Sequence, residues 1–259
     1  MIVLAAVFMF GTMVGSFLNV CIYRLPKDES VVFPGSHCGA CGKPVRWYDN
    51  IPVLSYFLLG GKCRDCKVAF AIQYALIEML TGLIFVLFYQ VFALSGVGFA
   101  YLVLALALLV QSMIDVRHKI IPDTITLPGI ILGVVLSTAF PALQGSGTWW
   151  GGLSGSVLGV LGGGGFLYFI AVAAEKILKK EAMGGGDVKL LAMIGAFLGL
   201  RGVAWTIFMG SVLGSFAGIY FKIKKSEDEI PFGPFLGVAA CLYIFFGDRV
   251  IDWYLLRFQ

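Results

Sequence analysis

The stretch GVGFAYLVLALALLVQSMI (residues 96–114) contains no charged residue and is followed directly by Asp115. A helix needs about 20 apolar residues to cross the hydrocarbon core of a bilayer, so this stretch is long enough for a transmembrane helix. Comparable apolar runs lie near 2–23, 71–94, 124–142, 151–175, 188–200, 203–221 and 231–247. We therefore expect an all-α polytopic membrane protein with about eight transmembrane helices.

The composition of the whole chain agrees with this expectation. Hydrophobic residues make up 59% of the 259 residues and charged residues only 13%, and the mean hydropathy is +0.92. A soluble domain carries roughly 25% charged residues, so the polar surface that such a domain needs is missing. The composition excludes soluble, disordered and nucleic-acid-binding classes, and the expected surroundings are a lipid bilayer.

The positive charges predict which segments face the cytoplasm. With the N-terminus outside, the inner segments are 24–70, 115–123, 176–187 and 222–230. These segments hold 16 of the 19 Lys and Arg residues once Lys189, one turn into its helix, is included. Because cytoplasmic loops carry an excess of Lys and Arg, this orientation is favoured. The first apolar run has no basic residue before it, which disfavours a cleaved signal peptide and favours a retained first helix.

Four of the six cysteines form two CxxC pairs, Cys38 with Cys41 and Cys63 with Cys66, separated by 21 residues. Two such pairs are typical of a tetrahedral Zn²⁺ site with four thiolate ligands. Disulfides or a redox couple are the alternative, but a reducing cytoplasm disfavours disulfides. A segment of this size buries little apolar area, so a structural metal would supply the missing stability.

Three acidic residues lie inside an apolar run or at its edge: Glu78, Asp115 and Asp187. Ionisable groups at membrane depth are costly and are therefore functional candidates. For Glu78, about two turns into its span, the plainer interpretation is a buried hydrogen-bonding partner. Asp115 ends the third predicted span and Asp187 opens the sixth, so both are expected at the cytoplasmic boundary. Asp123, before the next apolar run, is predicted to cap a helix.

Two carboxylates about 3 Å apart share one proton, which is the arrangement that aspartic proteases use to activate water. From spacing alone, three interpretations of Asp115 and Asp187 stay open: a protease pair, two helix-capping residues, or the cation site of a membrane transporter. A non-catalytic assembly scaffold that holds a partner through its zinc segment is a further alternative. Lys189 and Arg117 flank the pair and either keep one carboxylate ionised or extend toward the membrane surface.

Five sets of short motifs occur in order along the chain. They are GSFLNV (15–20) with RLP (24–26), YDNIPVLSY (48–56) between the CxxC pairs, Asp115 with Arg117 and IPD (121–123), MGGGDVKL (183–190), and PFGPFL (231–236). Together they resemble the bacterial type IV prepilin peptidases, which are leader peptidases and N-methyltransferases of the GxGD aspartic class. The resemblance runs nearly from end to end.

The resemblance implies two activities. Such enzymes cut the basic leader from prepilins or prepilin-like secretion proteins at the cytoplasmic side of the inner membrane, and then methylate the new N-terminal residue with S-adenosylmethionine. Asp115 and Asp187 match the two catalytic aspartates. Methylation is associated in the family with the zinc-binding segment, and particularly with the Gly-Lys pair that is here Gly61 and Lys62.

The expected organisation has three parts: a first transmembrane helix (1–23), a cytoplasmic zinc-binding segment associated with methylation (24–70), and a transmembrane aspartic peptidase domain (71–259). The sequence does not specify which prepilins are substrates, the oligomeric state, or the distance between the two aspartates.

Overall fold

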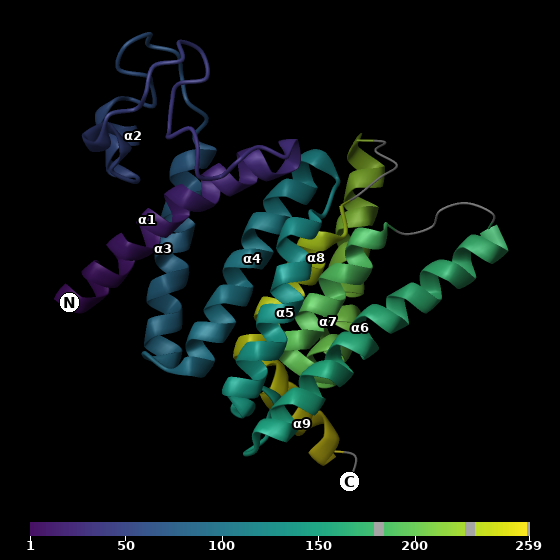
Figure 1. Cartoon of the computed structure of the whole chain (residues 1–259). Helices are drawn as coiled ribbons and strands as arrows, with labels where there is room; N and C mark the ends of the chain where they lie inside the picture. Colours follow the sequence, from purple (N-terminus) through teal and green to yellow (C-terminus); the bar gives the residue numbers. More distant parts are fainter. Residues whose placement is uncertain (179–183, 226–230, 258–259) are drawn as a thin grey trace. The chain divides into compact units, whose positions relative to one another are not determined.

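The computed structural model describes residues 1–178, 184–225 and 231–257 (Figure 1). Their regular structure is helical, with two isolated β-bridges and no longer β-ladder in these ranges. The chain divides into two compact units, Met1–Gly98 and Phe99–Gln259. Parts of two predicted inner segments, residues 179–183 and 226–230, lie outside the described residues, as does Met183 of the fourth motif.

The first unit is built on two long helices, α1 (Ile2–Arg24) and α3 (Gln73–Phe92), with the short elements η1 (Leu25–Lys27), η2 (Trp47–Asn50) and α2 (Leu54–Leu58) between them in sequence. The two helices approach closely because glycines lie where they cross. A Cβ on Gly11 would lie 2.8 Å from Phe85, and a Cβ on Gly15 would lie 2.8 Å from the Glu78 Cα. Small residues at such positions are a common way for membrane helices to pack.

The second unit contains α4 (Gly96–His118), α5 (Asp123–Ala139), α6 (Trp149–Leu178), α7 (Gly185–Lys225), α8 (Gly233–Leu242) and α9 (Asp248–Arg257), with α4 beginning three residues before the unit boundary. A 3₁₀ turn, η3 (Pro141–Gln144), follows α5, and a π-helical turn, η4 (Tyr243–Gly247), joins α8 to α9. Helices α6 and α7 pack closely, with Gly159 of α6 and Gly195 of α7 against each other's backbone carbonyl.

Helix α7 contains a break at Gly199, whose φ of 64° and ψ of −171° are not helical. A straight helix would place Val203 about 12 Å along the axis from Gly195, yet a Cβ on Gly195 would lie 3.0 Å from Val203 Cγ2. The chain therefore reverses at Gly199, and α7 consists of two helical arms. Glycine suits this position because it adopts positive φ without a steric penalty.

The break leaves carbonyl groups at the end of the first arm without partners in the helix. The Ser137 and Ser156 hydroxyls donate to Ala196 O at 2.8 and 2.7 Å, and the Gln144 amide donates to Phe197 O at 3.1 Å. In a membrane each unsatisfied backbone group costs several kcal/mol. Side chains from α5, η3 and α6 thus allow the helix to end inside the unit.

Six helices among the described residues are long and apolar enough to cross a membrane. This count of six is lower than the predicted number of about eight spans for two reasons. Asp123–Ala139 has only 17 residues and is shorter than the others. The predicted spans 188–200 and 203–221 are the two arms of α7, which the count of six takes as one long helix although the chain breaks at Gly199. The all-helical fold is confirmed, and the two arms of α7 agree with the two separate segments that the sequence predicts.

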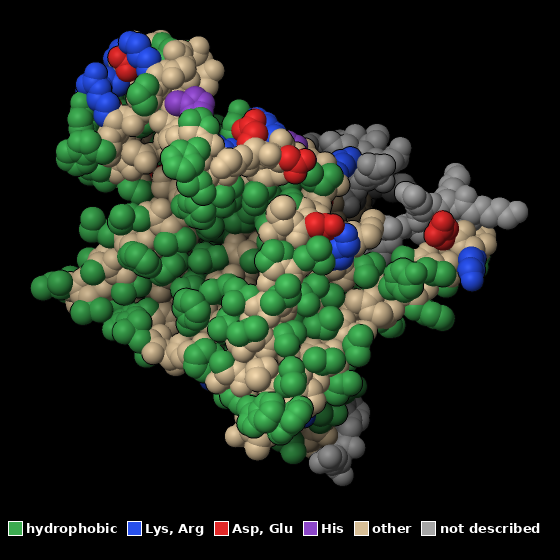
Figure 2. All heavy atoms as spheres, viewed as in Figure 1, with side chains coloured by type: hydrophobic (Ala, Val, Ile, Leu, Met, Phe, Trp, Pro, Cys, Tyr) green, Lys and Arg blue, Asp and Glu red, His purple; other side chains and the backbone are tan. Residues whose placement is uncertain are grey.

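The surface of each unit is mostly apolar, as a membrane protein requires. Hydrophobic side chains cover most of the visible face in Figure 2, while Lys and Arg side chains gather on the segment between α1 and α3. On α3, large exposed side chains recur every three to four residues: Leu76, Leu80, Leu83 and Leu87. This spacing forms one continuous helical stripe, which we assign to the lipid.

Candidate active site and metal centre

The four cysteines of the CxxC pairs come together in the segment between α1 and α3. Their Sγ atoms all lie within 4.8 Å of one another, and Cys38 Sγ lies 3.7 Å from Cys66 Sγ. Four thiolates at the usual Zn–S distance of 2.3 Å would be separated by about 3.8 Å. The cluster therefore fits one tetrahedral zinc ion, with all four positions filled by protein.

Each CxxC pair is held by the same turn. In the first turn the Cys38 N–H donates to Lys43 O, and the Gly42 N–H donates to Cys38 O. In the second turn the Cys63 N–H donates to Val68 O, and the Lys67 N–H donates to Cys63 O. The residue that closes each turn has positive φ, 68° at Gly42 and 61° at Lys67. Backbone N–H groups of Cys41 and Ala40 lower the pKa of the Cys38 thiol to about 6, which favours the thiolate form of this one ligand.

A bidentate ion pair ties the second CxxC pair to the segment between the two pairs. Arg64 donates from Nε and a terminal nitrogen to the two carboxylate oxygens of Asp49, at 2.8 and 2.6 Å. Paired N–H···O bonds of this kind fix orientation as well as adding energy. The pair lowers the pKa of Asp49 from its ordinary value of 3.8.

In the second unit, Asp115 lies near the end of α4 with 5% of its surface exposed. Its Oδ2 accepts the backbone N–H of Gly233 at 3.0 Å. Gly233 is the first residue of α8, so the positive end of that helix faces the carboxylate. A Cβ at Gly233 would lie 2.7 Å from Asp115 Oδ2, which explains why a glycine stands at this place in the PFGPFL motif.

Asp187 lies at the start of α7, close enough to Asp115 for the charges of the two carboxylates to interact. Ile121 is a neighbour of both aspartates' surroundings. A Cβ on Gly186, next to Asp187, would lie 2.7 Å from Ile121, and a Cβ on Gly233, which contacts Asp115, would lie 3.6 Å from it. Asp187 Oδ1 is buried and accepts no hydrogen bond from the described residues. The structure therefore brings the predicted pair to one site, where one carboxylate oxygen of Asp187 has no partner among the described residues.

The roles expected for Lys189 and Asp123 need correction. Lys189 Nζ lies 2.7 Å from both carboxylate oxygens of Asp123, so its ion pair is with Asp123. Asp123 is the first residue of α5 and Pro122 occupies the N-cap position; the predicted cap is therefore wrong. This ion pair joins α5 to α7 beside the two aspartates. Because its partners are 66 residues apart, sequence spacing could not reveal it.

Glu78 is a buried hydrogen-bonding residue, as its plainer interpretation predicts. It is 9% exposed, and its Oε2 accepts the Val53 N–H at 2.7 Å. Val53 has φ 62° and ψ −53°, and the Leu54 N–H donates to Pro52 O at 2.6 Å. These features define a γ-turn of the rare, strained kind. A β-branched residue pays for this conformation by about 1–3 kcal/mol, and the turn aims its N–H at Glu78.

Known proteins are similar to both units of the chain. Residues 9–92 match the Bacterial Peptidase A24 N-terminal domain, and residues 102–219 match the Type IV leader peptidase family. The chain belongs to the type IV prepilin leader peptidase/N-methyltransferase family. With six candidate spans among its described residues, it is a multi-pass bacterial membrane protein.

Curated members of this family align with the chain over most of its length. The prepilin leader peptidase/N-methyltransferase of Pseudomonas aeruginosa is 34% identical, over 95% of this chain and 91% of that protein. The protein of the same name from Neisseria gonorrhoeae is 35% identical, over 97% and 94%. The one from Myxococcus xanthus is 39% identical, over 86% of this chain and 65% of that protein. No solved structure shows significant similarity.

Membership of the prepilin peptidase family confirms the resemblance drawn from the five motifs. The roles of individual residues stay predictions. These are Asp115 and Asp187 as catalytic residues, the four cysteines as zinc ligands, and Gly61 with Lys62 in methylation. The three-part division of the chain also stays a prediction, because the two structural units do not show which stretch carries which activity.

Proposed function

We propose that this chain removes the leader peptide from type IV prepilins or prepilin-like secretion proteins and then N-methylates the new N-terminal residue with S-adenosylmethionine. The family supports both activities, since its curated members carry them in their names. The peptidase assignment rests on the Asp115–Asp187 pair. Asp115 has a fixed N–H donor, and Asp187 has a buried oxygen with no hydrogen-bond partner in the described part of the chain.

In the proposed cleavage, the two aspartates share one proton and act without a covalent intermediate. The Gly233 N–H stabilises negative charge on Asp115, so Asp115 is the group that takes a proton from water. Asp187 holds the shared proton and donates it toward the peptide carbonyl. The water oxygen adds to the carbonyl carbon. When the C–N bond breaks, the leaving amine takes up the proton that Asp115 removed from water, and the proton on the former carbonyl oxygen returns to Asp187.

The second activity is assigned to the segment between α1 and α3 (residues 25–72), which we name the Cys segment. Cys38, Cys41, Cys63 and Cys66 would hold a structural zinc ion, which has no open position for catalysis. S-adenosylmethionine supplies the methyl group, and Gly61 with Lys62 lies at the start of the second CxxC turn. We propose an outer N-terminus, which places the Cys segment, and with it the leader junction, on the cytoplasmic side.

The test mixes purified, detergent-solubilised protein with a synthetic prepilin and reads the mass of the product. We expect wild type to remove the leader and, with S-adenosylmethionine, to add the mass of a methyl group. Asp115→Asn and Asp187→Asn should each abolish cleavage. The matched control is Asp252→Asn, because Asp252 is an exposed acid of the same unit that pairs with Arg201.

Cleavage that persists in both Asn variants would refute the site assignment. The transporter interpretation would instead be favoured by ion flux in proteoliposomes that stops in the same variants while no prepilin is cut.

A further inference from the structure

The first unit contains a cavity of about 660 Å³ that the peptidase chemistry does not use. Its walls come from the C-terminal half of α1, the Cys segment and the first turns of α3. The volume lies within the usual range of small-molecule sites, about 300–1,000 Å³. The wall includes Cys38, Gly61 and Lys62, so the cavity adjoins the metal centre and contains both residues assigned to methylation.

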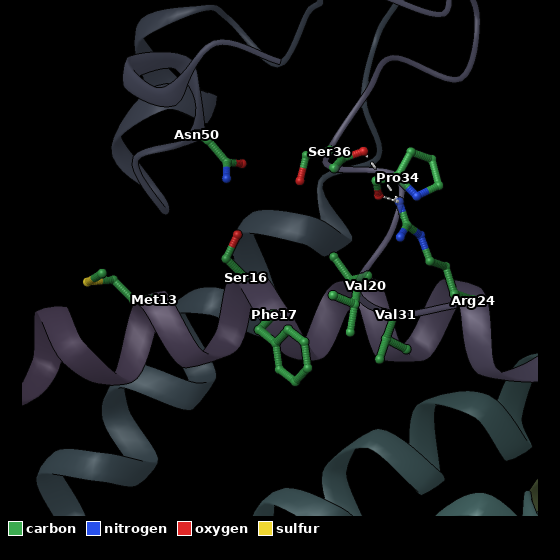
Figure 3. Close-up of a pocket in the computed structure, with 11 residues that line it drawn as sticks. Met13, Ser16, Phe17, Val20, Arg24, Val31, Pro34, Ser36 and Asn50 are labelled. Carbon is green, nitrogen blue, oxygen red and sulfur yellow. Dashed lines mark hydrogen bonds between the residues drawn. The ribbon is translucent and has the colours of Figure 1, made fainter. Parts of the chain in front are cut away.

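The polar floor of the cavity is built around Glu78. This carboxylate lines the cavity together with the Ser16 side chain and is held by the Val53 N–H of the γ-turn. A smaller pocket of about 270 Å³ shares Ser16 and Asn50 with it. Figure 3 shows these two side chains facing the space between α1 and the Cys segment. A carboxylate that lines a cavity offers an acceptor for a positively charged group of a ligand.

Aromatic side chains form another part of the wall, namely Tyr56, Phe70 and Tyr74. Gly61 fixes the first of them. It has φ of 67°, and a Cβ there would lie 2.8 Å from the Tyr56 ring. The Phe70 N–H also donates to Gly61 O at 2.7 Å. Gly61 therefore has a physical reason to be glycine, because any side chain would displace the Tyr56 ring from the cavity wall.

We propose that this cavity is the binding site of S-adenosylmethionine, with Glu78 facing the positively charged part of the methyl donor. The proposal rests on the proposed N-methyltransferase function and assigns its donor site. The flat adenine ring matches the aromatic wall, the sulfonium and ammonium groups match the Glu78 carboxylate, and the donor's own carboxylate matches Lys62. The site needs a folded Cys segment, since Cys38 and the residues after it form one side.

The test measures binding of S-adenosylmethionine to the full-length, zinc-loaded protein by isothermal titration calorimetry, independently of turnover. Glu78→Gln should weaken binding by about tenfold or more, because a buried charge pair loses one partner, while the amide can still accept the Val53 N–H. The matched control is Asp28→Asn, an exposed acid of the same unit outside the cavity. Its affinity should equal that of wild type.

A second variant removes reliance on charge. Ala71 lies exposed on the cavity wall, so Ala71→Trp would fill space without disturbing the packed interior, and it too should weaken binding. Zinc content and leader cleavage, measured on every variant, should stay at the wild-type level. If Glu78→Gln loses zinc, its weaker binding could come from an unfolded segment, and the cavity assignment is then tested by the affinity of Ala71→Trp alone.

Several results would overturn the cavity assignment. One is unchanged affinity in both cavity variants of a protein that methylates normally, and in that case the proposed function still stands. Another is a Glu78→Gln protein that binds S-adenosylmethionine normally but has a raised KM for the prepilin. That result would show that the Glu78 carboxylate binds the amine of the prepilin and not the methyl donor. Wild type that neither binds the donor nor methylates while still cleaving leaders would overturn both the cavity assignment and the methyltransferase activity.

Discussion

At the level of single residues, the contact between Gly233 and Asp115 decides how the acid pair is held. Asp115 ends an apolar run and Gly233 lies 118 positions later, so their pairing is a matter of tertiary structure. The glycine is required by space, because its amide must approach the carboxylate and its Cα hydrogen faces Asp115 Oδ2. The PFGPFL motif therefore has a positioning role at the pair.

Gly233→Ala should reduce the rate of leader cleavage by about a hundredfold, because the new methyl group displaces the Asp115 carboxylate from its place. The measurement is kcat for a synthetic prepilin at saturating substrate. Gly237→Ala, one turn further along α8, is the control: its Cβ would lie 3.0 Å from the Ser112 hydroxyl and 3.7 Å from the Leu108 side chain, and would not meet Asp115. Equal rates in the two variants would argue against the positioning role.

The Asp49–Arg64 pair makes a pH-dependent contribution to the Cys segment. Because Arg64 lowers the pKa of Asp49 below 3.8, the pair stabilises the folded segment at pH values above about 4 and is lost as the pH falls through the lowered value. Asp49→Asn should therefore unfold at lower urea concentration than wild type at pH 7, and the two should converge once the pH is below the lowered pKa of Asp49. The measurement is urea unfolding monitored by tryptophan fluorescence at several pH values. A difference between the two proteins that does not change with pH would contradict the role of the ion pair.

At the level of elements, the Cys segment lacks the core that a free-standing domain needs. Its regular structure consists of two 3₁₀ turns of three and four residues, η1 and η2, a helix of five residues, α2, and two isolated β-bridges. The two CxxC turns supply most of its remaining backbone order. The segment also carries one wall of the cavity, so its folding and the methyl-donor site are coupled through the metal.

Cys63→Ser should lower zinc content from about one ion per chain to almost none. With the metal lost, the segment between α1 and α3 should become sensitive to protease, and N-methylation should be lost. Zinc is measured by atomic emission and methylation by the mass of the pilin product. The control is Cys241→Ser, since Cys241 lies in α8, far along the chain from both CxxC turns. A Cys63→Ser protein that kept its zinc and full methylation would refute the metal centre.

At the level of the whole molecule, the reversal at Gly199 depends on three separate segments. Ser137 of α5, Gln144 of η3 and Ser156 of α6 all serve the carbonyl groups at the end of the first arm of α7. That arm begins at the catalytic candidate Asp187. The polar cluster thus anchors the far end of the helix that positions one member of the acid pair.

Gln144→Leu should destabilise the second unit by about 1–3 kcal/mol, because the Phe197 carbonyl loses its donor in a buried setting. The measurement is the thermal unfolding midpoint in detergent. The control is Ser154→Ala in α6, whose hydroxyl donates to a carbonyl of its own helix and should matter little. Identical midpoints for the two variants would show that water or another group can replace Gln144.

Much of the architecture follows from the pattern of residues along the chain. Long apolar runs must be helical in a bilayer, because only a helix or a closed barrel satisfies its backbone there. Paired CxxC spacing likewise identifies a four-thiolate cluster. The sequence is less informative where a helix ends inside the protein: the runs 188–200 and 203–221 predict a boundary near residue 201, yet whether a reversal at Gly199 is tolerated depends on donors from three other segments.

The amino-acid sequence was enough to establish the membrane class, the family, the four cysteines and the candidate aspartates, because these follow from local composition and from motifs of a few residues. Only the tertiary structure decided which residues pair with one another. The Gly233 amide on Asp115, the Lys189–Asp123 pair and the Val53 amide on Glu78 each join positions 25 or more residues apart. Such contacts depend on how helices pack, and spacing along the chain carries no record of that.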